Sequence, residues 1–139
     1  HMQGQPQTMQ ANPVYTNVVR EVGEFFSSRL RRLRDCGVGQ EQIILDPGIG
    51  FGKTVEHNLQ LLQTAGTFAG LARPLLIGVS RKSFIGKLLG TEIAARLPAA
   101  LACACAAVAA GVQIVRAHDV AETLQAIRMT EAILTKRKV

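Results

Sequence analysis

Residues 43–53 read IILDPGIGFGK, and this stretch decides the fold class of the 139-residue chain. The apolar run 43–45 predicts a buried parallel strand. The three glycines that follow let the backbone turn sharply and approach a ligand closely. Asp46 lies at the carboxyl end of this strand, which is where α/β folds bind their ligands. Asp46 is therefore the first candidate for a functional site.

The composition is that of an ordinary globular protein with a real core, because 47% of the residues are apolar and 19% are charged. The formal net charge is +6, which could attract nucleic acid or an anionic metabolite. The bases fall into separate groups, at residues 29–34 and 136–138, and no aromatic platform accompanies them. We therefore predict no nucleic-acid partner.

The three cysteines, Cys36, Cys103 and Cys105, form no disulfide framework and lack partners at zinc spacing. They indicate reduced thiols in a cytoplasmic protein. The apolar run 99–112 is short and rich in alanine, so it does not predict a membrane span, and no secretory signal is visible.

Helical and strand-like patterns alternate along the chain. Residues 1–13 are polar and predict a loop, and residues 14–33 predict a helix closed by Gly37. Strands are expected at 43–45, 75–79 and 113–116, with helices after Thr54, at 94–110 and after Asp119. Asp119 and Glu122 suggest a capping box, and the apolar residues of the last helix are expected to face inward, namely Val120, Leu124, Ile127 and Leu134.

This alternation predicts parallel strands joined by right-handed crossovers, in either a small doubly wound sheet or part of a (β/α)8 barrel. Each strand ends in polar residues: Asp46, then the run 80–83 (SRKS), then the run 116–118 (RAH). Because parallel strands present these ends at one face, we expect a carboxylate and several cations in one pocket. Such a pocket suits a ligand with an amidine-like edge and an anionic group.

Each of these residues also has a purely structural interpretation. Asp46 could cap the glycine-rich turn, Arg116 could pair with Asp119, and His118 could be a surface or satisfied histidine. Two common nucleotide-binding motifs do not fit, because the P-loop would need glycine at Pro47 and the dinucleotide fingerprint needs a different glycine spacing. The coincidence of polar residues at all three strand ends favours a binding site.

Four ordered motifs, 1–4 (HMQG), 46–53 (DPGIGFGK), 78–86 (GVSRKSFIG) and 116–120 (RAHDV), together resemble the bacterial dihydropteroate synthase family. The resemblance covers essentially the whole chain and the C-terminal half of that family's (β/α)8 TIM barrel. It implies an α/β fold with three parallel strands alternating with about four helices. Residues 1–13 would be a polar loop after a missing strand, and residues 14–139 a partial barrel domain.

The resemblance implies a transferase of folate biosynthesis. Such enzymes condense 6-hydroxymethyl-7,8-dihydropterin diphosphate with para-aminobenzoate to give 7,8-dihydropteroate and diphosphate, and they are sulfonamide targets. Carried over by motif, Asp46 and Lys82 would be the catalytic and pterin-binding residues, and Arg116, Ala117 and His118 would bind the diphosphate. Phe51 and Ser83 would bind para-aminobenzoate.

The resemblance also implies features beyond these side chains. A Mg²⁺ ligand is expected in the missing N-terminal half, with no metal site in this segment. A homodimer through the C-terminal helices is expected, and the segment alone is predicted to be inactive. Two alternatives stay open: the pterin-binding domain of a methyltetrahydrofolate methyltransferase, and a non-catalytic half-barrel module that binds a pterin or an anion.

Overall fold

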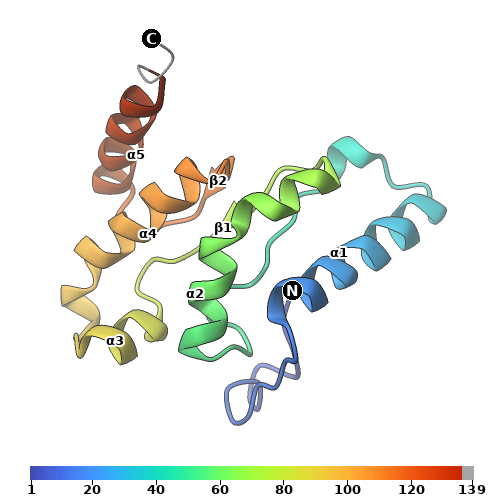
Figure 1. The fold of residues 1–139 in the computed structure, drawn as a ribbon, viewed down its shortest axis with the longest axis horizontal. Helices are drawn as coiled ribbons and strands as arrows, with labels where there is room; N and C mark the ends of the chain where they lie inside the picture. The colour runs from blue at the N-terminus through green and yellow to red at the C-terminus, as the bar shows by residue number, and fades with distance from the viewer. Residues whose placement is uncertain (136–139) are drawn as a thin grey trace.

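The computed structural model describes residues 1–135 of the chain. Helices alternate with short strands (Figure 1). The α-helices are α1 (Val18–Asp35), α2 (Val55–Gln63), α3 (Ser83–Leu89), α4 (Leu97–Ala109) and α5 (Val120–Thr135). The 3₁₀ helices are η1 (Gln40–Gln42), η2 (Ala65–Leu71) and η3 (Ile93–Ala95), and the strands are β1 (Leu76–Ile77) and β2 (Ile114–Val115). The α/β class predicted from the alternation is confirmed.

The two strands are parallel, with Leu76 opposite Ile114 and Ile77 opposite Val115. The strand expected at 43–45 contributes one isolated parallel bridge, Leu45 to Leu75, so a third strand is not confirmed. Leu45 N donates to Pro74 O at 2.9 Å, and Leu45 O accepts from Leu76 N at 2.7 Å. Extending this ladder back to Ile43 would require a backbone N–H at residue 74, and proline has none.

Helix α1 begins four residues later than the apolar pattern indicates. Asn17 caps it, and its side chain accepts a hydrogen bond from Arg20 N. The helix buries Val18, Val22 and Phe26, so its apolar face joins the core. Thr54 caps α2 as expected, with its hydroxyl accepting from His57 N.

The alanine-rich helix α4 packs against both α2 and α5. It begins at Leu97, and η3 takes the place of its expected first residues. Pro98 lies in its first turn, where the missing N–H costs little. The small side chains Ala100, Ala104 and Ala107 are buried, which allows the neighbouring helices to approach closely.

Two expectations for α5 were wrong. Val120 is 63% exposed and Leu124 is 44% exposed, whereas Thr123 on the same helix is buried. The periodic pattern indicates an apolar face but does not identify what covers it, and within residues 1–135 α5 packs mainly on α4. In Figure 1, α5 and α1 lie at opposite ends of the molecule, with α2 and α4 between them.

Within the described part of the chain, none of the helices combines the length and the apolar character that crossing a membrane requires.

Candidate functional site

Polar residues lie beyond the carboxyl ends of both strands, with Ser80 three residues after β1 and Arg116 directly after β2. Because the strands are parallel, these ends lie at the same edge. The polar residues surround a cavity of about 550 Å³. Its lining residues are Gly78, Ser80, Arg81, Lys82, Ile93, Arg116, Ala117 and His118. The strand-end pattern predicted this meeting of segments 38 residues apart. We refer to Lys82, Arg116 and His118 as the cationic cluster.

Residues 46–53, which we call the glycine loop, carry the predicted carboxylate Asp46, which is not among the residues that line the cavity. Asp46 follows Leu45 and is half-buried, and its Oδ1 accepts a hydrogen bond from Gly48 N at 2.7 Å. Gly48, Gly50 and Gly52 all adopt positive φ angles, of 72°, 82° and 58°. These conformations favour glycine, so the loop requires the spacing that the sequence shows. The bond within the turn occupies one oxygen of Asp46 and leaves the other outside this contact.

Two buried polar side chains hold the glycine loop together. Lys53 is only 4% exposed, and its Nζ donates to Gly48 O at 3.0 Å and Phe51 O at 2.9 Å. Asn58, at 1% exposed, accepts from Gly50 N at 2.7 Å and donates to Thr54 O at 2.6 Å. Burial lowers the pKa of Lys53 to about 8, against the opposing influence of Asp46. Lys53 is therefore a structural lysine rather than a free ligand-binding cation.

Lys82 connects the glycine loop to the cationic cluster. Its ammonium lies 3.7 Å from the centre of the Phe51 ring, which is a cation–π contact. Burial lowers the pKa of Lys82, the neighbouring Arg116 lowers it further, and Asp46 raises it. Lys82 thus senses the charges of both Asp46 and Arg116, so the acidic and basic parts of the predicted site are electrostatically coupled.

Glycines make room for the two long basic side chains. A Cβ on Gly50 would lie 2.9 Å from Lys82 Cδ, and a Cβ on Gly78 would lie 2.8 Å from Arg116 Nη2. Any larger residue at either position would displace the base beside it.

Arg81 adopts a positive φ of 58°, which is uncommon for a residue with a Cβ. Its Nη2 donates to Asp119 Oδ1 at 2.9 Å, and its carbonyl accepts from Arg96 Nη1 at 3.2 Å. The alternative that paired Arg116 with Asp119 is replaced by this Arg81–Asp119 pair. The Asp119 carboxylate bonds to Arg81 instead of making the expected side-chain cap of α5. The backbone oxygen of Asp119 accepts a hydrogen bond from Thr123 N at 3.1 Å.

His118 lies against Ser80, which is buried at the end of β1. Ser80 Oγ is 3.2 Å from His118 N and 2.9 Å from His118 Nδ1. The ring of His118 is thereby held at the cavity by the neighbouring strand end, although the residue as a whole is exposed, so the interpretation of a surface or satisfied histidine stays open.

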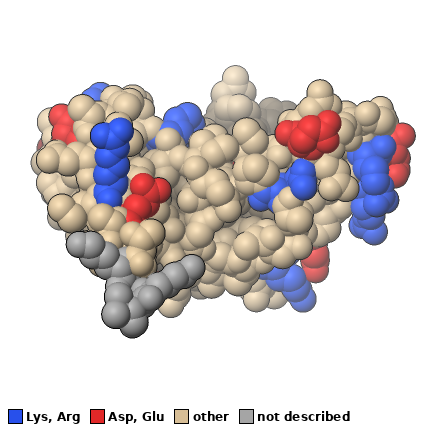
Figure 2. Space-filling model, turned by 90° about the horizontal axis from the view of Figure 1, so that it is seen from above, with Lys and Arg blue, Asp and Glu red and all other residues tan. Residues whose placement is uncertain are grey.

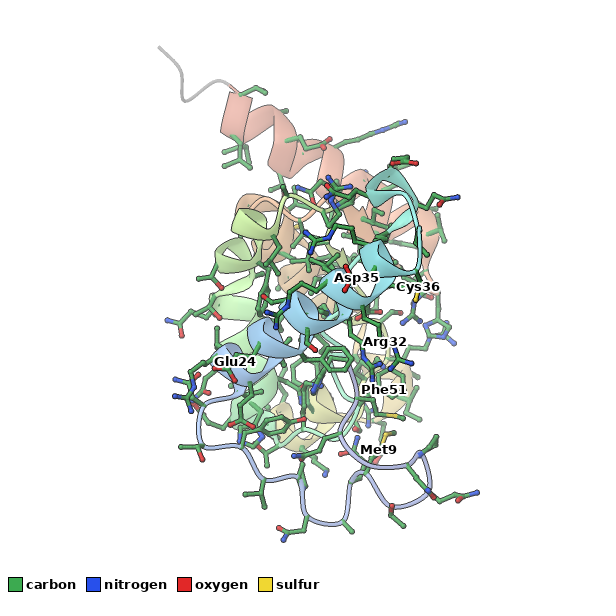
Figure 3. All side chains as sticks on the ribbon, turned by 90° about the vertical axis from the view of Figure 1, so that its right-hand side faces the viewer. Met9, Glu24, Arg32, Asp35, Cys36 and Phe51 are labelled. Atoms are coloured by element: carbon green, nitrogen blue, oxygen red, sulfur yellow. The ribbon has the colours of Figure 1, made fainter. Side chains whose placement is uncertain are left out.

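The remaining predicted residues lie beside the cavity rather than in its lining. The Phe51 ring packs against the ammonium of Lys82, which lines the cavity. Ser83 is the first residue of α3, and its side chain is exposed. In Figure 3, Phe51 lies on the side of the molecule that carries Met9 and the N-terminal loop. This loop touches the glycine loop, because Gln10 Nε2 donates to Gly50 O.

Sequence reasoning missed Asn58 and Arg96. Asn58 occupies an inward position of α2, where a helical pattern predicts an apolar residue. Its spacing of four residues from Thr54 was the available signal, since an asparagine there can bond back to the Thr54 carbonyl. Nothing in the sequence singles out Arg96, which depends on the path of the chain after α3.

Charged side chains elsewhere on the surface are dispersed. On the face drawn in Figure 2, Lys and Arg occur in separate groups with Asp and Glu beside several of them. Among residues 1–135, no group of three or more His, Cys, Asp or Glu side chains is placed to hold a metal ion.

Comparison with known proteins agrees with the motifs. Dihydropteroate synthase of Escherichia coli (strain K12) is 45% identical over 138 residues, covering 99% of this chain and 49% of the relative. The enzyme of the same name from Haemophilus influenzae is 46% identical over 132 residues, covering 95% and 48%. The chain therefore spans about half the length of the curated relatives it matches.

Solved structures show the same relationship. Dihydropteroate synthase of Yersinia pestis, in a sulfonamide drug complex, superposes with a TM-score of 0.95 at 40% identity, covering 98% of this chain and 50% of that one. The Thermus thermophilus enzyme in complex with 4-aminobenzoate gives a TM-score of 0.89 at 41% identity, covering 96% and 55%. Residues 1–118 match the family described as pterin binding enzyme. The chain belongs to the pterin binding enzyme family.

Proposed function

We propose that residues 1–139 supply the C-terminal half of the (β/α)8 barrel of a dihydropteroate synthase. The observation that carries this proposal is the position of Lys82, at a cavity shared with Arg116 and His118 and within electrostatic reach of Asp46. A pterin diphosphate needs this combination, because its ring presents N–H donors and its leaving group is strongly anionic. The relatives that share about half their length with this chain support the same assignment.

In the proposed site, Asp46 accepts hydrogen bonds from the pterin ring N–H and its 2-amino group. Lys82 donates to the ring oxygen and nitrogen. One oxygen of Asp46 is already bonded within the turn, which fixes the direction of the carboxylate. Charge-assisted hydrogen bonds of this kind are stronger than neutral ones and would orient the pterin in the cavity.

The reaction transfers the pterin methylene from diphosphate to an amine. The lone pair of the para-aminobenzoate nitrogen forms the new C–N bond as the C–O bond breaks, and the electron pair leaves on diphosphate. The amine then loses a proton. Arg116, His118 and the backbone at Ala117 stabilise the negative charge that develops on the leaving group.

Para-aminobenzoate is proposed to bind beside the pterin, with Phe51 along its ring and Ser83 near its carboxylate. The position of Phe51 supports this placement of para-aminobenzoate, because the Phe51 ring lies against Lys82, the proposed pterin-binding residue. Sulfonamides would then compete for the same position, as the drug complex of the Yersinia pestis enzyme suggests.

Further parts of the proposal lie outside the described site. Mg²⁺ is expected to bind through the N-terminal half of the barrel, and cytoplasmic location stays a prediction. A homodimer through the C-terminal helices is supported by the exposed apolar residues of α5, which are Val120, Leu124, Met129 and Ile133. We also propose that this segment supplies three strands of the barrel, namely β1, β2 and a third strand at residues 43–45.

Incorporation of radiolabelled para-aminobenzoate into dihydropteroate tests the proposal. The enzyme would be a hybrid in which the N-terminal half of the Escherichia coli relative precedes residue 1, with the isolated chain assayed in parallel. We expect product from the hybrid and none from the isolated chain. A well-folded hybrid that binds pterin diphosphate without turnover would instead favour the non-catalytic module, and transfer of a methyl group from a reduced folate would favour the methyltransferase alternative.

A further inference from the structure

One hydroxyl group faces two nitrogen atoms of His118. Ser80 Oγ lies 3.2 Å from the backbone nitrogen of His118 and 2.9 Å from ring atom Nδ1. The serine follows β1 and the histidine follows β2, so the two contacts join the ends of neighbouring strands. Ser80 is 9% exposed and lines the cavity, and the hydrogen bonds that its hydroxyl makes within residues 1–135 are the two to His118.

The direction of each hydrogen bond follows from the atoms involved. A backbone N–H can only donate, so the His118 amide occupies a lone pair of Ser80 Oγ. The serine O–H proton still needs an acceptor, and among residues 1–135 the only acceptor in reach is His118 Nδ1. If Nδ1 carried a proton instead, the buried hydroxyl proton would have no partner in this part of the chain, which is costly.

We propose that Ser80 is a positioning residue that holds neutral His118 with its proton on Nε2. With Nδ1 accepting from the serine, Nε2 is the ring atom left to donate. His118 lines the cavity with Lys82 and Arg116, so this N–H is available to an anion there. His118 then donates a hydrogen bond to the leaving group even when the imidazole is uncharged.

The ligand part of this inference rests on the proposed function, whereas the position of the proton does not. The two are therefore tested by separate measurements on the same hybrid protein. The first reads the proton directly, and the second reads its effect on an anion.

Nitrogen NMR of ¹⁵N-histidine-labelled hybrid, at a pH well above the ordinary titration range of an imidazole, locates the proton. The His118 signals are assigned by their loss in His118→Gln. We expect Nδ1 unprotonated with the shift of a hydrogen-bonded acceptor, and Nε2 protonated. In Ser80→Ala the Nδ1 signal should move to that of an unbonded acceptor, and in Ser80→Thr it should return. A proton on Nδ1 in the unmodified hybrid would overturn the proposal.

Calorimetric titration with inorganic diphosphate measures the consequence. Loss of one positioning hydrogen bond predicts affinity about 3- to 10-fold weaker in Ser80→Ala. Ser80→Thr should restore affinity to within about twofold, because it keeps the hydroxyl. Ser27→Ala is the matched control, since Ser27 Oγ bonds within α1 to Gly23 O, far from the cavity. Unchanged affinity in Ser80→Ala would overturn the positioning role.

The outcomes separate the two proposals. If the hybrid binds no diphosphate but shows the expected His118 proton position, the proposed function fails and the role of Ser80 in fixing the tautomer stands. If Ser80→Ala does not fold, the nitrogen spectrum of the unmodified hybrid still decides the position of the proton.

Discussion

The glycine loop and the cationic cluster meet at Lys82, yet they are built in opposite ways. The loop is held by buried groups, with Lys53 and Asn58 each making two hydrogen bonds to its backbone or the adjoining turn. Arg116 and His118, in contrast, are exposed, although His118 also makes two hydrogen-bond contacts with Ser80. Substitutions of Lys53 and Asn58, which hold the loop, should therefore act through folding, whereas substitutions of Asp46 or of the cluster should act mainly through binding.

Arg116→Ala should give the largest effect and should act on ligand binding and turnover rather than on folding. Removing one charge-assisted contact to a developing anion costs about 2–4 kcal/mol, or roughly 30- to 1000-fold in rate. Calorimetry of the hybrid with pterin diphosphate should show loss of measurable binding, while the thermal unfolding midpoint stays within about 1 °C because the side chain is exposed. Asp46→Ala should lose binding similarly. Unchanged affinity in either variant contradicts the assignment.

Gly50→Ala should affect both folding and binding, and so tests the division between the two regions. Its φ is 82°, and the new Cβ would lie 2.9 Å from Lys82 Cδ. The strained backbone costs about 1–3 kcal/mol of unfolding free energy. The shifted Lys82 should also weaken pterin-diphosphate binding.

Gly37→Ala is the control for this variant. Gly37 has a similar φ of 79°, but nothing lies within 4 Å of its added Cβ. We expect the same loss of stability in denaturant unfolding without a loss of binding. Equal binding by both variants would show that contact with Lys82 has no functional effect.

Lys53 should give the glycine loop a recognisable pH dependence. Its folded-state pKa of about 8 lies below its ordinary value of 10.5, so the folded state binds fewer protons between these two values. The contribution of Lys53 to stability should therefore rise with pH across this window. Denaturant unfolding of the hybrid and of Lys53→Met should show this as a slope in their difference. Lys87→Met, on α3, is the control, and a slope of opposite sign would contradict the burial of a charged lysine.

The Arg81–Asp119 pair should have the smallest effect. The two side chains meet at 2.9 Å, but Arg81 is half-exposed, so water screens the pair. A double-mutant cycle with Arg81→Ala and Asp119→Ala should give a coupling of about 0.2–1 kcal/mol in unfolding free energy. A coupling well above this range would show that the Arg81–Asp119 pair, like the glycine loop, contributes to holding the fold together.

The sequence predicts the meeting of strand ends better than the details of packing. Polar residues after parallel strands must share an edge, and this is why Lys82, Arg116 and His118 could be expected around one cavity. Local patterns do not show which polar residue replaces an apolar one in the core, as Asn58 does. Local patterns also do not show which element packs on the apolar face of a helix. For this reason the prediction that Val120 and Leu124 are buried is wrong.

The crystal structure of the hybrid bound to a non-reactive pterin diphosphate analogue tests the central claim most directly. The account predicts the pterin between Asp46 and Lys82, with the diphosphate on Arg116 and His118 in the cavity at the ends of β1 and β2. Density for the ligand at any other place, or a pterin turned away from Asp46, would contradict it.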